Sequence, residues 1–533
     1  MITTRPPTCP CPQCGFASSE KPLPNGISPA RLQVFFDCND APVGAERAEL
    51  EAVVCEGEHY LALLQQRISQ TRDTLESLLE EQKRAVKHIS DSKLVLNPVR
   101  RLPSEILSHI FLSCILPDSE LLRSSDGEED ASLLDSLNIT DSPWNVSYVS
   151  SQWRHAALAT AKLWSFIRLQ LHRYKSHAAS LFRLGTYLER SGTQQLTVAI
   201  ESEEDMSDHP ILPVILSASP RWKKLFVGLP FSAFRIFNNI SGSLSALTWL
   251  GIYMDSEPDT GTEPISMIEA FRFAPQLQEL KIVEWDWGTN FHDLFHLPWE
   301  HITEASTQGN NMQALAVLQR APNLVSALFS ADVDFLSDTP SELCWHAHLQ
   351  VLDVTTGTGS SPEFIVELFE RLALPGLLEL RIALSGTEEE IVLPEFTSET
   401  APILEDLCIQ IDDSNTLDSE TLACLLKHTP LLTDLKVSAR VTTDNVFLQL
   451  GRKRDISRLV PLLRSIDLTG STFEFEDASN IIIGMVASRT EPAEGCVSLQ
   501  TLILDEPFFF EDDDLSARWE RLGQDGLDIQ YSG

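Results

Sequence analysis

Leu349-Gln-Val-Leu-Asp-Val354 and Leu377-Leu-Glu-Leu-Arg-Ile382 are two copies of one phrase, Leu-x-x-Leu-x-Leu/Ile/Val, which recurs through much of this 533-residue chain. Further copies begin at Leu277, Leu324 (stretched), Leu404, Leu432, Leu463 and Leu499, with more degenerate ones at Trp222 and Leu244. From Leu349 onward, successive first leucines lie 28, 27, 28, 31 and 36 residues apart. Apolar residues that alternate with polar ones predict a strand in each copy.

Helical patterns precede several copies of the phrase, at residues 362–374, 419–428 and 478–488. A period of this size predicts a solenoid of leucine-rich repeats. One unit cannot bury its own apolar strand and helix face, so the units stack and share a continuous core. A generic α/β domain also alternates strands with helices, and it remains the alternative. We therefore predict an α/β repeat fold, a leucine-rich-repeat solenoid, over residues 169–533.

Polar residues stand between the repeated leucines and are expected to point out of the core. This set can form a recognition face for a client protein, or it is simply the solvated face of a sheet. Its members are Glu279, Lys281, Asp353, Glu379, Arg381, Asp406, Asp434, Lys436 and Asp467.

Residues 45–95 contain no proline and predict one long helix. Apolar residues recur there in alternating steps of three and four, which is a heptad register. A dimerising coiled coil through residues 46–93 and a long helix folded back on its own chain are equally open. Residues 1–44 are rich in proline and predict a disordered arm. The heptad seam consists of Leu61, Leu64, Ile68, Leu75, Leu78, Ala85 and Ile89, with Thr71 and Gln82 as its polar members.

Between the long helix and the repeats, residues 96–168 predict an all-α module. Its first helix starts near Pro103, where a missing N–H is tolerated, and its apolar stripe ends at Pro117. An acidic loop follows over residues 124–130, and a further helix is expected over 143–160. Leu163 and Trp164 then form a turn before a strand at 166–172.

Four segments of this region carry a family resemblance. Leu102-Pro-Ser-Glu-Ile-Leu-Ser-His-Ile-Phe111 resembles the opening helix of an F-box, and Val149-Ser-Ser-Gln-Trp-Arg154 is similar to its Val-x-x-x-Trp-Arg segment. Ala157-Leu-Ala-Thr160 with Leu163-Trp164 resembles the closing segment, and Tyr187-Leu-Glu-Arg-Ser-Gly192 follows. Together they resemble the F-box-like family of basidiomycete fungi, over residues 95–200. The sequence departs from the family pattern in two places. Ser150-Ser151 stands where a cysteine often precedes Trp-Arg, and an insertion between Pro117 and Pro143 makes the module longer.

The resemblance implies an adaptor without catalytic activity. An F-box docks on the Skp adaptor of an SCF-type E3 ubiquitin ligase, and the Skp adaptor links it to the cullin. The repeats would bind a client protein. The alternative is a leucine-rich-repeat scaffold outside any ligase, dimerising through the long helix. The resemblance assigns nine positions to partner binding, and these residues are expected to divide between the Skp interface and the module's own core. They are Leu102, Pro103, Ile106, Leu107, Ile110, Phe111, Trp153, Leu163 and Trp164. For Leu107 and Ile110 the core is the favoured place.

Composition excludes several classes of partner. Forty basic against 77 acidic side chains give a net charge of −37, and the sequence pI is near 4.6. Such a polyanion repels nucleic acid and anionic membranes. Residues 1–24 contain no apolar signal segment, and the ten cysteines are scattered. These features predict a cytoplasmic or nuclear protein.

Two groups of residues contain metal-ligating side chains, but neither has the complete spacing of a metal site. His292-Asp-Leu-Phe-His296, with Glu300 and His301 beyond it, is interrupted by Pro298 and offers no third ligand at a defined spacing. Cys9, Cys11 and Cys14 lack the second pair that a structural zinc needs. With no phosphate-binding glycine loop or nucleophile motif, the sequence predicts no catalytic residue, no cofactor and no metal.

Overall fold

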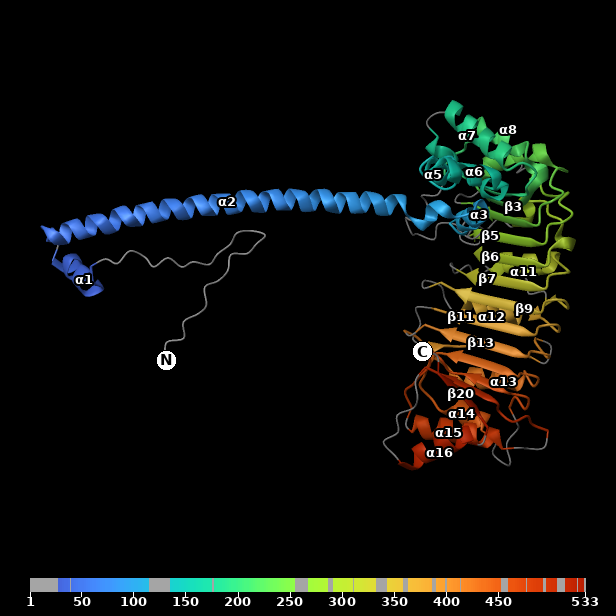
Figure 1. Cartoon of the computed structure of the whole chain (residues 1–533). Coiled ribbons are helices and arrows are strands. Elements are labelled where there is room, and N and C mark those ends of the chain that lie inside the picture. The colour runs from blue at the N-terminus through green and yellow to red at the C-terminus, as the bar shows by residue number, and fades with distance from the viewer. Residues whose placement is uncertain are drawn as a thin grey trace. The chain divides into compact units, whose positions relative to one another are not determined.

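The computed structural model of the chain divides into two units, Met1–Leu102 and Pro103–Gly533. It describes residues 27–38, 40–114, 135–174, 177–254, 267–285, 291–309, 311–331, 343–357, 363–385, 390–397, 400–412, 414–451, 459–475, 477–491, 495–505, 513–524 and 526–531. The first unit is helical, and the second is dominated by one large parallel sheet (Figure 1). The chain is therefore an α/β solenoid-like fold that follows an N-terminal helical region.

The first unit contains α1 (Pro29–Cys38), α2 (Ala45–Val95) and the short 3₁₀ helix η1 (Pro98–Arg101). The long helix expected over residues 45–95 is α2, which is 51 residues long and has no buried residue. It ends where Asn97 accepts a hydrogen bond from the Val99 N–H, as the cap of η1. The structure differs from the predicted disordered arm at α1, because the Arg31 guanidinium pairs with the Glu46 carboxylate (2.9 Å) and joins α1 to α2.

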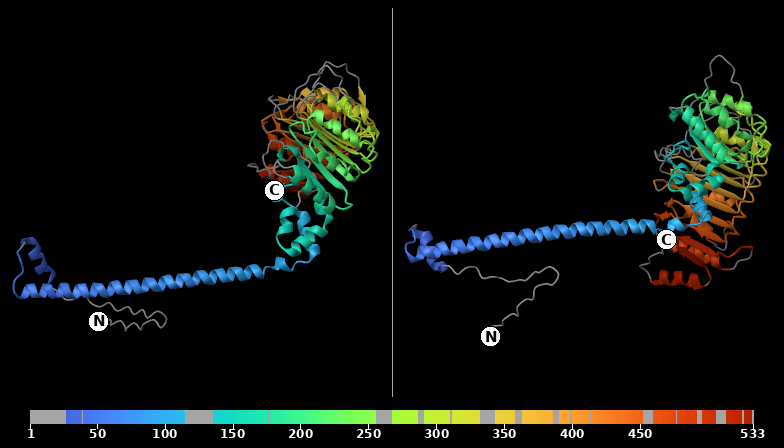
Figure 2. Two further views of the ribbon diagram at one scale, coloured as in Figure 1. Left: turned by 90° about the horizontal axis from the view of Figure 1, so that it is seen from above. Right: turned by 45° about the horizontal axis from the view of Figure 1, so that its top comes forward.

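Fourteen strands of the second unit form one sheet, and every pairing between neighbours is parallel. The strands follow one another nearly in chain order, as a ladder (Figures 1 and 2). They are β1 (Phe166–Gln170), β2 (Leu196–Glu201), β3 (Trp222–Gly228), β4 (Trp249–Tyr253), β5 (Glu279–Trp285), β6 (Glu304–Gly309), β7 (Ser326–Ala331), β9 (Val351–Thr356), β11 (Glu379–Leu384), β13 (Asp406–Ile411), β15 (Asp434–Ser438), β17 (Ser465–Asp467), β19 (Thr501–Leu504) and β20 (Asp528–Tyr531).

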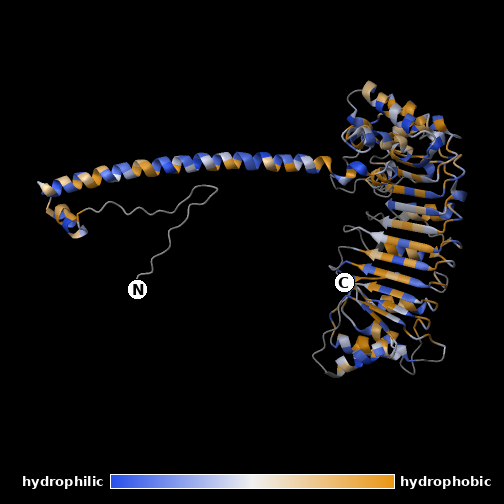
Figure 3. Ribbon diagram, viewed as in Figure 1, coloured by the Kyte–Doolittle hydropathy of each residue, from blue (hydrophilic) through white to orange (hydrophobic). Residues whose placement is uncertain are grey.

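The leucines of the repeated phrase explain this register. The second leucine of each copy pairs with that of the next, in a row of Leu352, Leu380, Leu407, Leu435, Ile466 and Leu502. None of these side chains is more than 3% exposed. Full burial of such a side chain is worth about 1.5–3 kcal/mol, so the row stabilises the stack at every strand. Hydrophilic and hydrophobic residues alternate along the strands in Figure 3, as one buried and one open face require.

Four of the fourteen strands, β1, β2, β6 and β20, carry no copy of the phrase, and of these only β1 was expected, from the strand pattern over residues 166–172. The sequence of β6, Glu-Ala-Ser-Thr-Gln-Gly, contains no leucine, and β2 and β20 lack the Leu-x-x-Leu spacing. Their strand conformation is set by hydrogen bonds to neighbouring strands, which a pattern of leucines cannot reveal. Two smaller parallel sheets accompany the main one, formed by β8 (Cys344–Trp345) with β10 (Leu372–Ala373), and by β12 (Glu390–Ile391), β14 (Thr416–Leu417), β16 (Arg440–Val441) and β18 (Thr472–Phe473).

Helices connect many of the strands, and the three helical patterns expected ahead of the repeats are α12 (Glu363–Glu370), α13 (Ser419–Lys427) and α15 (Ala478–Thr490). Asp418 caps α13 by accepting from the Glu420 N–H, and Leu422, Leu425 and Leu426 of that helix are buried. The other connecting helices are α7 (His177–Arg190), α8 (Ile211–Leu216), α9 (Phe231–Phe234), α10 (Phe291–Leu294), α11 (Asn311–Arg320), α14 (Asn445–Leu450) and α16 (Asp513–Gln524).

The helices ahead of β1 belong to the same unit as the sheet. They are α3 (Ser104–Ser113), α5 (Trp144–Tyr148), α6 (Ser151–Ala159) and the 3₁₀ helix η3 (Ala161–Trp164), and we call them the helical module. The boundary predicted at residue 168 was wrong, because it falls inside β1. The single helix expected over 143–160 was also wrong: Ser150 is extended and caps a new helix by accepting from the Trp153 N–H (3.2 Å).

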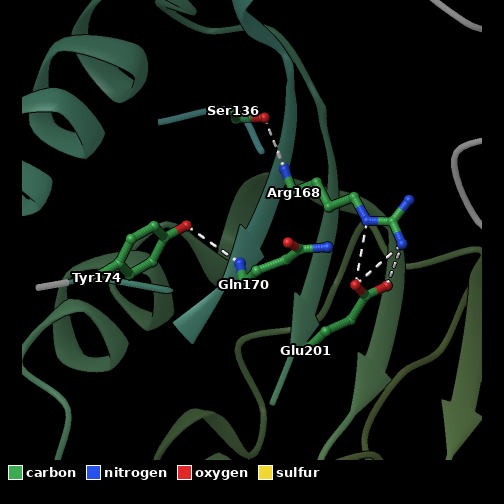
Figure 4. A network of polar contacts seen from close by, with 5 residues as sticks. All are labelled: Ser136, Arg168, Gln170, Tyr174 and Glu201. Atoms are coloured by element: carbon green, nitrogen blue, oxygen red, sulfur yellow. Dashed lines mark hydrogen bonds and ion pairs between the residues drawn. The ribbon is translucent and has the colours of Figure 1, made fainter. Parts of the chain in front are cut away.

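β1 is the first strand of the sheet, and Ser136 forms hydrogen bonds with its outer edge (Figure 4). The Ser136 N–H donates to the Arg168 carbonyl (3.0 Å), and the Arg168 N–H donates to the Ser136 hydroxyl (2.9 Å). The Tyr174 hydroxyl accepts from the Gln170 N–H (3.2 Å). An uncovered edge presents free backbone groups that pair with other chains. The chain therefore closes this end of the sheet with its own residues.

An ion pair at the same edge joins β1 to β2. The Arg168 guanidinium donates to both carboxylate oxygens of Glu201, at 2.9–3.2 Å, and only 3% of the Arg168 side chain is exposed (Figure 4). A charge in this position is tolerated because it is paired, and removal of one partner leaves the other charge buried.

We predict that Glu201→Ala lowers the free energy of unfolding by about 3 kcal/mol, because it leaves the buried Arg168 charge without its partner. The double variant Arg168→Met/Glu201→Leu should recover most of this loss, since it replaces the pair by packed apolar groups. Thermal unfolding followed by circular dichroism measures both. A double variant that is no more stable than Glu201→Ala would contradict this account.

Candidate interaction surfaces

One face of α3 forms the core of the helical module. Leu107 and Phe111, one helical turn apart, are buried. The Phe111 ring packs against Trp153, with their centroids 5.0 Å apart. The Thr160 hydroxyl donates to the Ser108 hydroxyl (2.7 Å), which adds a polar link between α3 and the end of α6. Leu107 and Phe111 are thus core residues, and no partner reaches them in this arrangement.

A second face of α3 is apolar and open to solvent. Ile106 is 46% exposed and Ile110 is 41% exposed, and these residues are four positions apart, so they share one stripe of the helix. We call this pair the α3 face. Pro103, just ahead of the helix, is also exposed. The expectation that Ile110 lies in the core was wrong, because the packing direction of α3 is set by Leu107 and Phe111.

Leu163 and Trp164 belong to a buried aromatic cluster and not to a partner surface. Trp164 packs edge-on against Trp144 (5.2 Å between centroids) and Tyr187 (5.0 Å). The Arg190 guanidinium lies over the Trp164 ring at 4.3 Å, and its partial burial lowers the pKa of Arg190. The assignment of Leu163 and Trp164 to partner binding was therefore wrong.

The aromatic cluster explains the phrase Tyr187–Gly192 and contains one residue, Trp144, that the sequence did not indicate. Tyr187 and Arg190 are members of the phrase Tyr187–Gly192, and they link α7 to the module. Trp144 was not singled out from the sequence, because its partners are distant in the chain; its Nε1–H donates to the Ser136 carbonyl (2.9 Å). Of the remaining positions assigned to partner binding, Leu102 and Trp153 are partly buried.

The second candidate surface is the face of the sheet opposite the buried leucines. Over β9 to β19 it forms a hollow of about 620 Å³ lined by charged side chains from successive strands. Two ion pairs cross it, Lys436 with Asp467 (3.0 Å) and Arg381 with Asp353 (4.0 Å). We call this surface the charged hollow. It contains most of the residues that the sequence predicts to point outward, and the ladder brings them together.

A row of acidic side chains runs along the open face, and two of its members, Asp406 and Asp434, line the charged hollow. Glu379, Asp406 and Asp434 are direct neighbours on β11, β13 and β15. Burial raises the pKa of Asp406 above its ordinary value, and the carboxylates of Asp434 and Glu379 raise it further. Burial likewise raises the pKa of the Cys408 thiol, so this cysteine stays protonated at neutral pH and is not an activated nucleophile.

Another part of the open face, on β3 and β4, is aromatic. Phe226 on β3 is buried beneath the partly buried rings of Trp249 and Tyr253. The Trp249 ring lies across Gly251, where an added Cβ would come within 2.5 Å of it, and the Tyr253 ring lies beside Gly228, 3.2 Å from where a Cβ would stand. The open face therefore changes along the ladder, from an aromatic patch on β3 and β4 to the charged hollow on β9 to β19.

The histidine cluster does not assemble a metal site. α10 covers only Phe291–Leu294, so His292 and His296 do not share a helix, and His296 pairs with Glu269 (3.2 Å). Within the described ranges, no three His, Cys, Asp or Glu side chains are arranged to hold a metal ion. Three features of the sequence lie outside the described residues: the cysteines Cys9, Cys11 and Cys14, the expected helix end near Pro117, and the acidic loop.

Where the structure describes a helix, none combines the length and apolar character needed to cross a membrane.

No protein-family model matches the chain, and no curated protein matches it either.

We predict that Asp406→Asn stabilises the protein at pH 7. The raised pKa of Asp406 means that the folded protein disfavours its ionised carboxylate. Ionisation therefore lowers the free energy of unfolding of the unmodified protein as the pH rises from 3.8, the ordinary pKa of the group, through its higher pKa in the folded state. The advantage of the variant should shrink as pH falls toward 4. Midpoints of thermal unfolding for both proteins at pH 7 and pH 4.5 measure this. A difference that does not depend on pH would refute it.

Proposed function

We propose that this chain is a substrate-recognition adaptor of an SCF-type ubiquitin ligase. In this proposal the helical module is an F-box that binds the Skp adaptor, which links it to a cullin. The sheet and its helices are leucine-rich repeats that hold a client protein. The chain positions the client and carries out no chemistry itself.

The α3 face is the single observation that carries the proposal. α3 buries Leu107 and Phe111 in its own unit, yet it leaves Ile106 and Ile110 in water. A helix with apolar residues on two faces needs a second surface to cover the exposed one. These two isoleucines stand at positions that the F-box resemblance assigns to Skp binding.

The open face of the sheet supports the client-binding half. Its strands present side chains of varied chemistry on a rigid backbone, with aromatic rings at β3 and β4 and charged groups from β9 to β19. Binding surfaces commonly combine aromatic anchors with charges that set orientation and specificity. The proposal assigns the client to this face.

A leucine-rich-repeat scaffold outside any ligase is the second candidate function. Two observations favour it. Trp144 of the helical module donates to the carbonyl of Ser136, which covers β1, and Trp144 and Trp164 pack on Tyr187 of α7, so the module has a structural role at this end of the sheet. In that case the α3 face has no ligase partner.

We predict that Ile106→Glu/Ile110→Glu abolishes binding of the full chain to the purified Skp adaptor. The affinity should fall by roughly 100-fold or more, because buried aliphatic anchors contribute about 2 kcal/mol or more each. Calorimetric titration or a pull-down measures the loss, and circular dichroism checks that the fold is retained.

The matched control is Ile403→Glu/Leu431→Glu, which changes two exposed aliphatic side chains elsewhere in the same unit. It should bind the Skp adaptor like the unmodified chain. Absence of binding by the unmodified chain would favour the scaffold.

A further inference from the structure

α2 presents an apolar seam to solvent along most of its length. Leu61, Ile68, Leu75, Leu78 and Ile89 each expose more than half of their surface. In the described part of the first unit, the Arg31–Glu46 ion pair holds α1 near the start of α2, ahead of these residues. Helices in proteins owe most of their stability to the packing of an apolar face. Among the described residues of the first unit, nothing therefore covers this seam of the 51-residue helix.

We propose that the partner is a second copy of this chain, and that the two α2 helices pair in an antiparallel coiled coil. The seam supplies the a and d positions of four heptads, from Leu61 to Ile89. It extends about 42 Å along the helix at 1.5 Å per residue. This assembly is independent of the ligase proposal, since it uses none of the residues of the α3 face.

Charges beside the seam disfavour a parallel pair. In a parallel coiled coil, a residue at g faces the e residue five positions later in the partner. Arg67 would then face Arg72 of the second copy, and this contact would occur twice. Like charges in these positions destabilise a coiled coil and select against the arrangement.

An antiparallel pair centred between Leu75 and Leu78 removes these clashes. Arg72 then lies beside Leu79 of the second copy, Glu58 lies beside Lys93, and Arg67 meets the imidazole of His88 in place of a second guanidinium. The e and g positions set the orientation of helices in this way.

The layers of the seam from Leu64 to Ile89 also match in this antiparallel register, and Leu61 lies opposite Ser92. Leu75 packs on Leu78 of the second copy, and Leu64 packs on Ile89. The two polar members, Thr71 and Gln82, meet each other and can form a hydrogen bond. The small Ala85 faces Ile68, whereas a parallel pair would place two alanines together and leave a cavity.

The antiparallel register has a consequence for the geometry of the dimer. Val95, the last residue of α2, lies level with Glu58 of the second copy. The C-terminal ends of the two helices are then about 55 Å apart, at 1.5 Å per residue. A parallel pair would place those ends side by side.

Light scattering of the full chain after size exclusion tests the dimer. We expect a dimer for the unmodified chain and a monomer for Leu75→Glu/Leu78→Glu, which places like charges in the two central layers. The matched control is Leu63→Glu/Leu94→Glu, because both leucines are exposed on α2 but off the seam. This control should remain dimeric. A monomeric unmodified chain, or equal effects of the two variants, would overturn the proposal.

Oxidative cross-linking tests the register, in a chain whose exposed and N-terminal cysteines are replaced by serine. Ile68→Cys/Ala85→Cys should give a cross-linked dimer, since these positions face each other. Neither single variant should cross-link. A cross-linked dimer from Ile68→Cys alone would show a parallel pair and refute the antiparallel register. Ile106→Glu/Ile110→Glu should leave the dimer intact, which separates this proposal from that of the α3 face.

Discussion

The structure depends on one constraint: no repeat can bury the leucines of its own strand. Leu352, Leu380 and Leu407 lie in one row because each strand pairs in parallel with the next, in register. A slip of one residue would turn every leucine of a strand to the open face, so the buried row fixes the register of the whole ladder. The irregular spacing of the repeats is absorbed in the connections between strands.

A stack of this kind has two ends that must be closed. At the first end, Ser136 and Tyr174 take up the backbone groups of β1, and Trp144, Trp164 and Tyr187 pack the helical module against α7. At the other end, β20 is a short, mostly exposed strand. A short edge with a charged residue such as Asp528 is one of the ways in which proteins limit edge pairing. The helical module is thus a cap for the sheet as well as the element that carries the α3 face.

The same ladder determines what the open face can offer. Parallel pairing in register places side chains from successive strands in rows, so single residues far apart in the chain become neighbours. Arg381 and Asp353 come together in this way, and so do Lys436 and Asp467. Parallel pairing also brings Asp406 beside Asp434 and Glu379, and the repulsion between these carboxylates adds to burial in raising the pKa of Asp406.

The sequence by itself determined the main elements of this protein. The spacing of leucines identified most strands of the ladder, and the unbroken heptads identified α2, because both are local periodicities. It also indicated which residues between the leucines point outward. Only the tertiary structure decided the direction in which α3 packs, the break at Ser150, the burial of Leu163 and Trp164, and the formation of strands β2, β6 and β20. These features depend on contacts such as Trp144 with Ser136 and Arg168 with Glu201, which join residues that no local pattern relates.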